Sequence, residues 1–450
     1  MKDRTLIGSL TSEIGKKITV AGMVDIRRDH GKLIFLVVRD RSASVQAVVH
    51  ASAAEAFTAT SAVRVQSPIK IVGTVVERSE KTRKADEVNG NIELQIESLA
   101  ILGKTHELPF EIESELNIET YFDHLPLTLR QQRARDIFTV QGTIVNTYRE
   151  TLRTQGFTEF QSPALVGGDA EGGSAVFKVH YYNDHDAYLA TSPQFYKQIM
   201  VGPFERSFTI AKIFRAEKSA TTRHLSELTQ MDFEMGFIDD HTEVMAMLEL
   251  VVRSVVQEVE SKHRDVFSRL GTTVPLLGEK FVQLTLTEAQ EIIEKEYNIK
   301  CIGEQDMEPE HERLICEWSA REKGTDFVFI THFPTKKRAF YTFADDAKPG
   351  FSKSFDLLFR GLEINSGSQR IHDYDELIGR INERGMDPTK FDFYLEAFKS
   401  GMPPHGGCST GLERFTARML ELKNVKEASA FPRDMTRIDK RINQENQAAK

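Results

Sequence analysis

The sequence predicts an α+β protein with a strand-rich first domain and a larger second domain of helices and strands. Two observations support this prediction. Short segments in which apolar and polar residues alternate dominate the first hundred residues, whereas apolar residues recur every three or four positions after residue 130. The chain has 450 residues, 40% hydrophobic and 28% charged, which is enough for two or three domains with large cores.

Five strands and one helix are expected in the first domain, which we place at residues 1–104. The strands are expected at 18–26, 33–38, 45–49, 69–76 and 92–101, and the helix at 51–62. A helix between the third and fourth of five strands is the order of an OB-type β-barrel. The pattern alone favours that barrel only slightly over another small five-stranded barrel.

An irregular segment at 105–130 is expected to link this domain to a second one at 131–450. Two long helices with an apolar face are expected in the second domain, one at 133–155 and one from about Thr242. Short, charged helices are expected at 263–323, and we interpret this region as a peripheral insertion.

Composition excludes several classes of protein. The three cysteines, Cys301, Cys316 and Cys408, are not paired in the sequence, which argues against a zinc site and a disulfide framework and favours a reducing cytoplasm. No apolar run is long enough for a signal peptide or a membrane span, so we expect no membrane partner. With a formal net charge of −9, any surface for nucleic acid must be local.

Three blocks of the sequence indicate a binding or catalytic site. The first is a polar block that follows a strand-like segment. It contains Arg215, Glu217, Arg223 and His224, and a second apolar segment follows it. Arginine in a hairpin of this kind can form paired hydrogen bonds with phosphate oxygens. The sequence contains neither a P-loop nor a Gly-x-Gly-x-x-Gly motif, so ATP, if it binds, binds in another way.

An acidic block and a glycine-rich block follow. Asp356 and Glu363 are seven residues apart on two expected strands, where both carboxylates could face one Mg²⁺ ion; the alternative is a surface salt network. Gly406 and Gly407 precede a helix-like segment that carries Arg414, an arrangement that favours phosphate.

In this order the blocks resemble the three signature motifs of class II aminoacyl-tRNA synthetases. Motif 1 is the helix and strand that end at Pro163, motif 2 the Phe214-Arg215-x-Glu217 hairpin, and motif 3 Gly411-Leu412-Glu413-Arg414. Further blocks, spread over nearly the whole chain, resemble the aspartyl enzymes of the archaeal and eukaryotic type. They are Gly172-Gly173-Ser174, Ser192-Pro193-Gln194-Phe195-Tyr196-Lys197-Gln198, Thr222-Arg223-His224-Leu225, Ser366-Gly367-Ser368-Gln369-Arg370-Ile371-His372-Asp373 and Pro403-Pro404-His405-Gly406-Gly407.

The resemblance implies a class II catalytic domain, an antiparallel sheet flanked by helices, in a cytoplasmic homodimer. The implied reaction activates L-aspartate with ATP and Mg²⁺ and transfers it to tRNA-Asp, and to tRNA-Asn if specificity is relaxed. Two alternatives stay open: an asparaginyl-tRNA synthetase, and a non-catalytic, synthetase-like paralogue that only binds tRNA.

The resemblance also implies the residues of the sites. Catalysis would depend on two arginines, Arg215 and Arg414. The residues implied in ATP binding are Arg215, Glu217, Arg223, His224, Glu363 and Arg414. Those implied in aspartate binding are Glu171, Gln194, Lys197, Asp232, Ser366, Arg370 and His405. The implied metal ligands are Asp356, Glu363 and Ser366, and the implied anticodon-binding residues are Arg28, Phe35, Gln46 and Glu93.

Three positions depart from the family pattern. Leu228 stands where motif 2 has a phenylalanine that stacks on adenine, and Cys408 and Ser409 stand where motif 3 has an aromatic residue and a glycine. We therefore expect adenine to lose part of its aromatic platform. For Phe35 and His405, structural roles in the barrel core and in a loop remain as alternatives.

Overall fold

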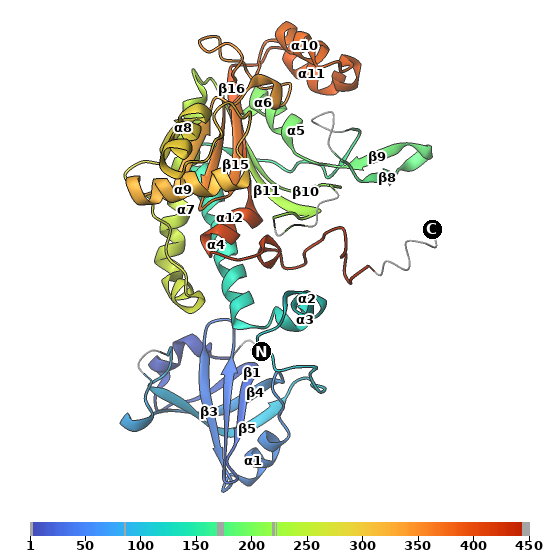
Figure 1. Ribbon diagram of the computed structural model, residues 1–450. Coiled ribbons are helices and arrows are strands. Elements are labelled where there is room, and N and C mark those ends of the chain that lie inside the picture. Colours follow the sequence, from blue (N-terminus) through green and yellow to red (C-terminus); the bar gives the residue numbers. More distant parts are fainter. Residues whose placement is uncertain (1–2, 85–86, 169–174, 218–220, 222, 443–450) are drawn as a thin grey trace. The chain divides into compact units, whose positions relative to one another are not determined.

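The computed structural model describes residues 3–84, 87–168, 175–217, 221 and 223–442. The chain forms two compact units, Met1–Glu111 and Ile112–Lys450 (Figure 1). Among the described helices, none has the length and apolar character that crossing a membrane requires.

The first unit is a closed five-stranded barrel, which confirms the predicted OB fold. Its strands close in the order β1 (Lys17–Asp29), β2 (Leu33–Arg39), β3 (Ser44–His50), β5 (Ile92–Ile101) and β4 (Pro68–Glu77). Helix α1 (Ala54–Ser61) lies between β3 and β4 along the chain, as expected. Every second residue of β2 and β3 is buried, so one set of side chains fills the barrel and the other set faces outward.

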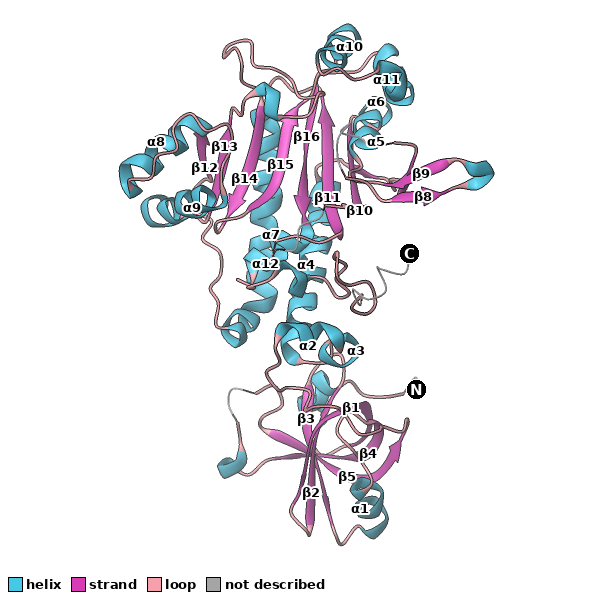
Figure 2. Cartoon of the chain, turned by 45° about the vertical axis from the view of Figure 1, so that its right-hand side comes forward, coloured by secondary structure: helices cyan, strands magenta, loops and turns pink. Residues whose placement is uncertain are grey.

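An eight-stranded sheet forms the centre of the second unit (Figure 2). Its order is β12 (Val282–Thr285), β13 (Phe327–Thr331), β14 (Ser354–Phe359), β15 (Glu363–Gln369), β16 (His405–Gly411), β11 (Glu227–Gly236), β10 (Arg206–Phe214) and β6 (Thr158–Glu159). The predicted antiparallel arrangement holds for the six strands from β13 to β10. It is wrong at both edges, where β12 pairs with β13 and β6 with β10 in parallel, so the sheet is mixed.

Two long helices pack against each other in the second unit, and both contribute to its core. They are α4 (Gln132–Thr154) and α7 (His241–Leu270). Helix α7 begins with a capping box between Asp240 and Glu243 and ends at Gly271, whose left-handed backbone favours glycine. The helix therefore continues past residue 263, where the sequence suggested that an insertion begins.

The inserted region joins one edge of the sheet. Its helices α8 (Leu286–Tyr297) and α9 (Pro309–Lys323) lie beside β12, β13 and β14 (Figure 2). The apolar faces of the two helices form a separate small core with these strands. The region thus contributes one strand, β12, to the sheet as well as the charged helices that the sequence predicted.

The remaining elements surround this framework. Strands β7 (Leu165–Val166), β9 (Asp186–Leu189) and β8 (Lys178–His180) form a small separate sheet. The other helices are α2 (Ile118–Asp123), α3 (Leu125–Thr128), α5 (Gln194–Ile199), α6 (Val201–Phe204), α10 (Tyr374–Glu383), α11 (Asp392–Lys399) and α12 (Leu412–Met419). Short 3₁₀ helices occur at Ile7–Glu13, Glu80–Thr82, Tyr182–Asp184, Thr335–Lys337, Pro388–Phe391 and Val425–Ala428.

Candidate active site

Two adjoining cavities lie over the central strands of the second unit. The first is lined by all six residues implied in ATP binding, Arg215, Glu217, Arg223, His224, Glu363 and Arg414. The second is lined by four of those implied in aspartate binding, Gln194, Lys197, Ser366 and Arg370. Both cavities share the side chains of Arg215, Gln230, Ser366 and Ser409. A ligand that spans the two cavities would therefore meet Arg215 at their junction.

The first cavity is lined by three arginines, Arg215, Arg223 and Arg414, and by three glutamates, Glu217, Glu363 and Glu413. Arg215 directly follows β10, and its backbone N–H donates to the Ser226 carbonyl, 2.9 Å away, which continues the β10–β11 hairpin. Burial and the nearby positive charges of Arg414, Arg215 and Arg223 lower the pKa of His224, against the opposing effect of Glu217. This concentration of guanidinium groups suits a polyanion such as a triphosphate.

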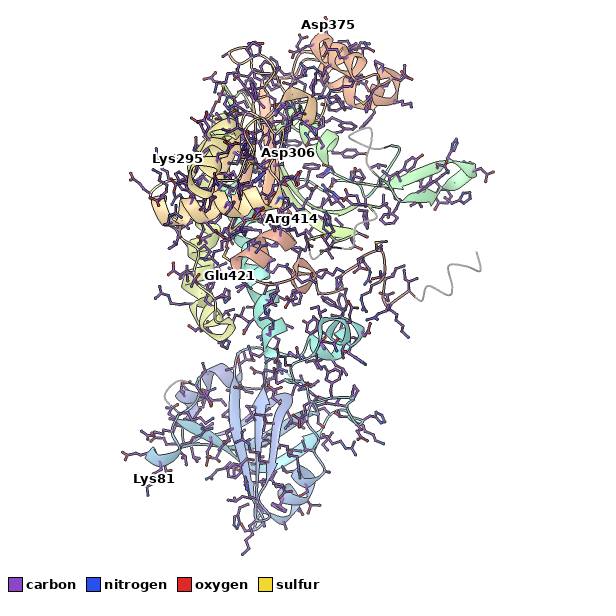
Figure 3. All side chains as sticks on the ribbon, viewed as in Figure 1. Lys81, Lys295, Asp306, Asp375, Arg414 and Glu421 are labelled. Carbon is purple, nitrogen blue, oxygen red and sulfur yellow. The ribbon has the colours of Figure 1, made fainter. Side chains whose placement is uncertain are left out.

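Arg414 enters the first cavity from the start of α12, where Figure 3 labels it. Strand β16 runs directly into this helix, so the arginine sits on rigid elements on both sides. Its Nη1 donates to the Glu363 carbonyl at 3.0 Å and lies 3.5 Å from Glu363 Oε2. The backbone of β15 therefore holds the guanidinium beside one of the implied metal ligands.

The implied metal ligands come together on adjacent strands, because Asp356 on β14 pairs with Ser366 on β15. Arg338 donates to both carboxylate oxygens of Asp356, at 3.0 and 2.7 Å, and from Nη1 to Ser366 Oγ at 3.2 Å. Burial and the charge of Asp356 raise the pKa of Glu363, against the opposing charges of Arg414, Arg338 and Arg215.

The side-chain oxygens of Asp356, Glu363 and Ser366 are ligands of the type and charge that suit Mg²⁺. In the described part of the chain, no three His, Cys, Asp or Glu side chains cluster as a complete metal site. Mg²⁺ ordinarily binds through one or two carboxylates and takes its other ligands from substrate phosphates and water. Asp356 and Glu363 would supply such carboxylates to a bound Mg²⁺, and Arg338 already offsets part of the charge of Asp356.

Four charged side chains meet beneath the second cavity, and we call them the buried quartet: Lys197, Asp232, Glu234 and Arg370. Lys197 Nζ lies 2.9 Å from Asp232 Oδ2 and 3.4 Å from Glu234 Oε2. Arg370 donates from Nε and Nη2 to the two oxygens of Glu234, at 2.7 and 3.2 Å. Although burial opposes ionisation, Arg370 and Lys197 hold the pKa of Glu234 below its ordinary value. The quartet is therefore electrically neutral.

Sequence reasoning missed Glu234, although a signal for it was present. Asp232 and Glu234 are two positions apart on β11, so both point to the same face, while Phe233 between them packs in the core. Gly407 makes room for this carboxylate, because a Cβ atom at that position would lie 2.1 Å from Glu234 Oε2. The glycine-rich block thus gives space to an acid as well as to a ligand.

The quartet occupies most of the hydrogen-bonding capacity of its cations. Lys197 donates to the Cys408 carbonyl at 3.0 Å, in addition to its ion pairs with Asp232 and Glu234. Arg370 donates further to Ser368 Oγ at 2.6 Å and to the Gly407 carbonyl at 2.8 Å. Four of its five N–H groups thus have partners among the described residues, and one Nη1 hydrogen is left for a ligand.

His405 lies outside the lining of the second cavity and is fully buried. Its Nδ1 donates to the Pro403 carbonyl at 2.9 Å, and its Nε2 accepts from Gln198 at 2.9 Å. Burial lowers the pKa of His405 to about 4, so the ring is neutral at pH 7. These contacts match the structural alternative for this histidine. Glu171 lies outside the described residues.

The three departures from the family pattern lie in different surroundings. Cys408 points into the core, where burial raises the pKa of its thiol to about 12. Leu228 lines the first cavity, which also has the apolar side chains of Leu225, Ile364 and Val425. Ser409 lines both cavities and donates to Asp232 Oδ1 at 2.7 Å. The serine thus adds a bond to an implied substrate-binding carboxylate.

The four implied anticodon-binding residues lie on the outward-facing side of the barrel. Phe35 is half-buried and belongs to the outward set of β2, so it is not part of the barrel core. Arg28 stands opposite it on β1. Gln46 on β3 donates to Glu93 Oε2 on β5 at 3.2 Å. The barrel therefore presents an aromatic ring, a cation and a polar pair on one face, as OB folds do for single-stranded bases.

Comparison with known proteins agrees with this geometry. Residues 117–435 match the family described as tRNA synthetases class II (D, K and N), and residues 18–102 match the OB-fold nucleic acid binding domain. The chain is 40% identical to the aspartate–tRNA(Asp/Asn) ligase of Thermus thermophilus, over 97% of this chain and 99% of the relative. It is 38% identical to the ligase of the same name from Deinococcus radiodurans, over 97% and 98%.

A solved structure supports the same relationship. The asparaginyl-tRNA synthetase of Pyrococcus horikoshii, complexed with asparaginyl-adenylate, superposes with a TM-score of 0.89 at 30% identity. The match covers 97% of this chain and all of that structure.

Proposed function

The chain belongs to the class II tRNA synthetases for aspartate, lysine and asparagine, and we propose that it ligates L-aspartate to tRNA through an aspartyl-adenylate. The observation that carries this proposal is the pair of adjoining cavities. One is lined by the arginines that suit a triphosphate, the other reaches Arg370, and Arg215 lines both. A nucleotide and an acidic amino acid bound there would meet beside a guanidinium group.

In the first step an oxygen of the aspartate α-carboxylate attacks the α-phosphorus of ATP, and the bond to the β-phosphate breaks. Arg215 at the junction offsets negative charge around the α-phosphate, and Arg223, His224 and Arg414 hold the leaving pyrophosphate. Asp356, Glu363 and Ser366 would hold Mg²⁺, which would supply further positive charge beside the phosphates. The reaction needs no protein nucleophile, because orientation and charge neutralisation supply the catalysis.

In the second step the terminal ribose hydroxyl of tRNA attacks the aspartyl carbonyl carbon, and AMP leaves. The relatives named for both tRNA-Asp and tRNA-Asn support relaxed tRNA specificity. We further propose that the enzyme acts in the cytoplasm as a homodimer, with α4 in the interface. Light scattering of the purified chain would measure the oligomeric state.

Asparagine ligation is the second candidate, because the solved P. horikoshii structure is an asparaginyl enzyme. Arg370 favours aspartate: its remaining Nη1 hydrogen forms a charge-assisted bond with a carboxylate and a weaker one with a neutral amide. Exchange of labelled pyrophosphate into ATP with each amino acid decides between them. We expect aspartate-dependent exchange; if aspartate supports none, the proposed function is wrong, and exchange with asparagine alone would favour the second candidate.

The choice of tRNA requires a charging assay with purified tRNA-Asp and tRNA-Asn. We expect aspartate to be attached to both. Strict rejection of tRNA-Asn would contradict the relaxed specificity without affecting the activation step.

Replacing Phe35 with alanine is expected to weaken tRNA binding about 5- to 150-fold, which corresponds to the roughly 1–3 kcal/mol of one stacked base. The ring is half-exposed on the outward face, so its loss should change the stability of the barrel little. Filter binding with tRNA-Asp measures the effect, and Val37→Ala, on the same face of β2, is the matched control. Equal affinities of the two variants would show that Phe35 does not stack on the tRNA.

A further inference from the structure

The inserted region supplies one buried carboxylate to the edge of the first cavity. Oε2 of Glu312, on α9, lies 3.6 Å from Nη1 of Arg223. The same oxygen accepts from the backbone N–H of Glu363 at 3.3 Å. Helix α9 is thereby tied both to the motif 2 loop and to the strand that carries an implied metal ligand.

The other acids near Glu312 do not share this environment. The Glu312 side chain is 12% exposed, whereas those of Glu310 and Glu317 on the same helix are 61% and 52% exposed and pair with Arg313. Glu312 also faces the carboxylate of Glu363, and burial together with this neighbour raises the pKa of Glu312 to about 7. A buried acid beside a second acid destabilises the fold unless a cation compensates it.

The compensating cations belong to the first cavity. Arg223 and Arg414 lower the pKa of Glu312. A carboxylate beside these two arginines offsets part of the repulsion between their guanidinium groups. The cluster therefore depends on an acid from the inserted region.

We propose that Glu312 is a positioning residue for Arg223, and that α9 is part of the ATP-binding machinery. The proposal rests on the proposed function. Arginine has a long, flexible side chain but a planar head with five donors. Contact of Nη1 with Glu312 orients this head and leaves its other donors for phosphate oxygens. The bond from the Glu363 backbone fixes Glu312 in turn, so the position of Arg223 is set relative to β15.

The test compares Glu312→Gln with Glu310→Gln, a matched change on the exposed side of the same helical turn. Pyrophosphate exchange is measured while ATP and aspartate are varied in turn. We expect Glu312→Gln to raise the KM for ATP about tenfold, with kcat and the KM for aspartate within about threefold of wild type. Glu310→Gln should leave all three values unchanged. An unchanged KM for ATP in Glu312→Gln would overturn the proposal.

A double-mutant cycle with Arg223→Gln separates positioning from a general structural role. If Glu312 acts through Arg223, the double variant should have the same KM for ATP as Arg223→Gln alone. If the two substitutions change the KM for ATP by factors that multiply in the double variant, the proposal is wrong. This comparison holds even if Glu312→Gln also lowers stability. If the wild type shows no exchange, the proposed function is wrong. In that case the role of Glu312 is decided by the Kd of ATP, measured by calorimetry for the wild type, the two single variants and the double variant.

Discussion

Replacing Arg370 with leucine is expected to lower aspartate-dependent pyrophosphate exchange by about 10³-fold or more and to leave ATP binding unchanged. Arg370 lines the second cavity but not the first, and one of its Nη1 hydrogens has no acceptor among the described residues, so it can bind a substrate carboxylate. Exchange measures the loss of activity, and calorimetry with ATP measures the retained binding. Aspartate turnover in this variant would show that the amino acid binds elsewhere.

The same substitution is expected to destabilise the fold by about 3–5 kcal/mol, because Glu234 would remain buried without its main partner. A double variant, Arg370→Leu with Glu234→Met, removes both charges and should recover most of that stability. Urea unfolding measures the recovery. The double variant should still lack exchange, which would separate the loss of the substrate contact from the loss of the fold.

Replacing Arg414 with glutamine is expected to lower the kcat of exchange by about 10²- to 10³-fold, the effect of removing one preorganised group from a developing charge. The KM for aspartate should change little, because Arg414 does not line the second cavity. Stability should change by less than about 1 kcal/mol, since the Arg414–Glu363 pair is partly exposed.

Arg418→Gln is the matched control for that substitution. Arg418 lies one turn further along α12 and does not line the first cavity. The kcat of the Arg418→Gln variant should stay within about threefold of the wild-type value, because the residue lies outside the reacting site. An unchanged kcat in Arg414→Gln would show that the arginine does not act on the phosphates.

The barrel followed from the sequence because its signals are local. Alternating burial along β2 and β3, and a helix between the third and fourth strands, are visible in short windows of residues. The direction of the edge strands was not predictable in this way. Strand β6 has only two residues and pairs with β10, almost fifty positions later, so no local pattern shows that the pairing is parallel.

The site residues show the same difference between local patterns and long-range packing. Residues within the three motif blocks were predicted, and the structure gathers most of them around two cavities. Arg338 and Glu312 were missed, because one comes from an irregular segment and the other is one of several acids on α9. Which acid of a charged helix becomes buried depends on the packing of α9 against β13 and β14, which single-sequence periodicity does not report.

The buried quartet also restricts how this enzyme can evolve. Each of its charges is balanced by a neighbour, so replacing any one of the four residues leaves another buried charge without its partner. A descendant that preferred a neutral amino acid would have to pass through an impaired intermediate or change two positions together. Selectivity for the substrate is thereby protected against drift by the same interactions that keep the domain folded.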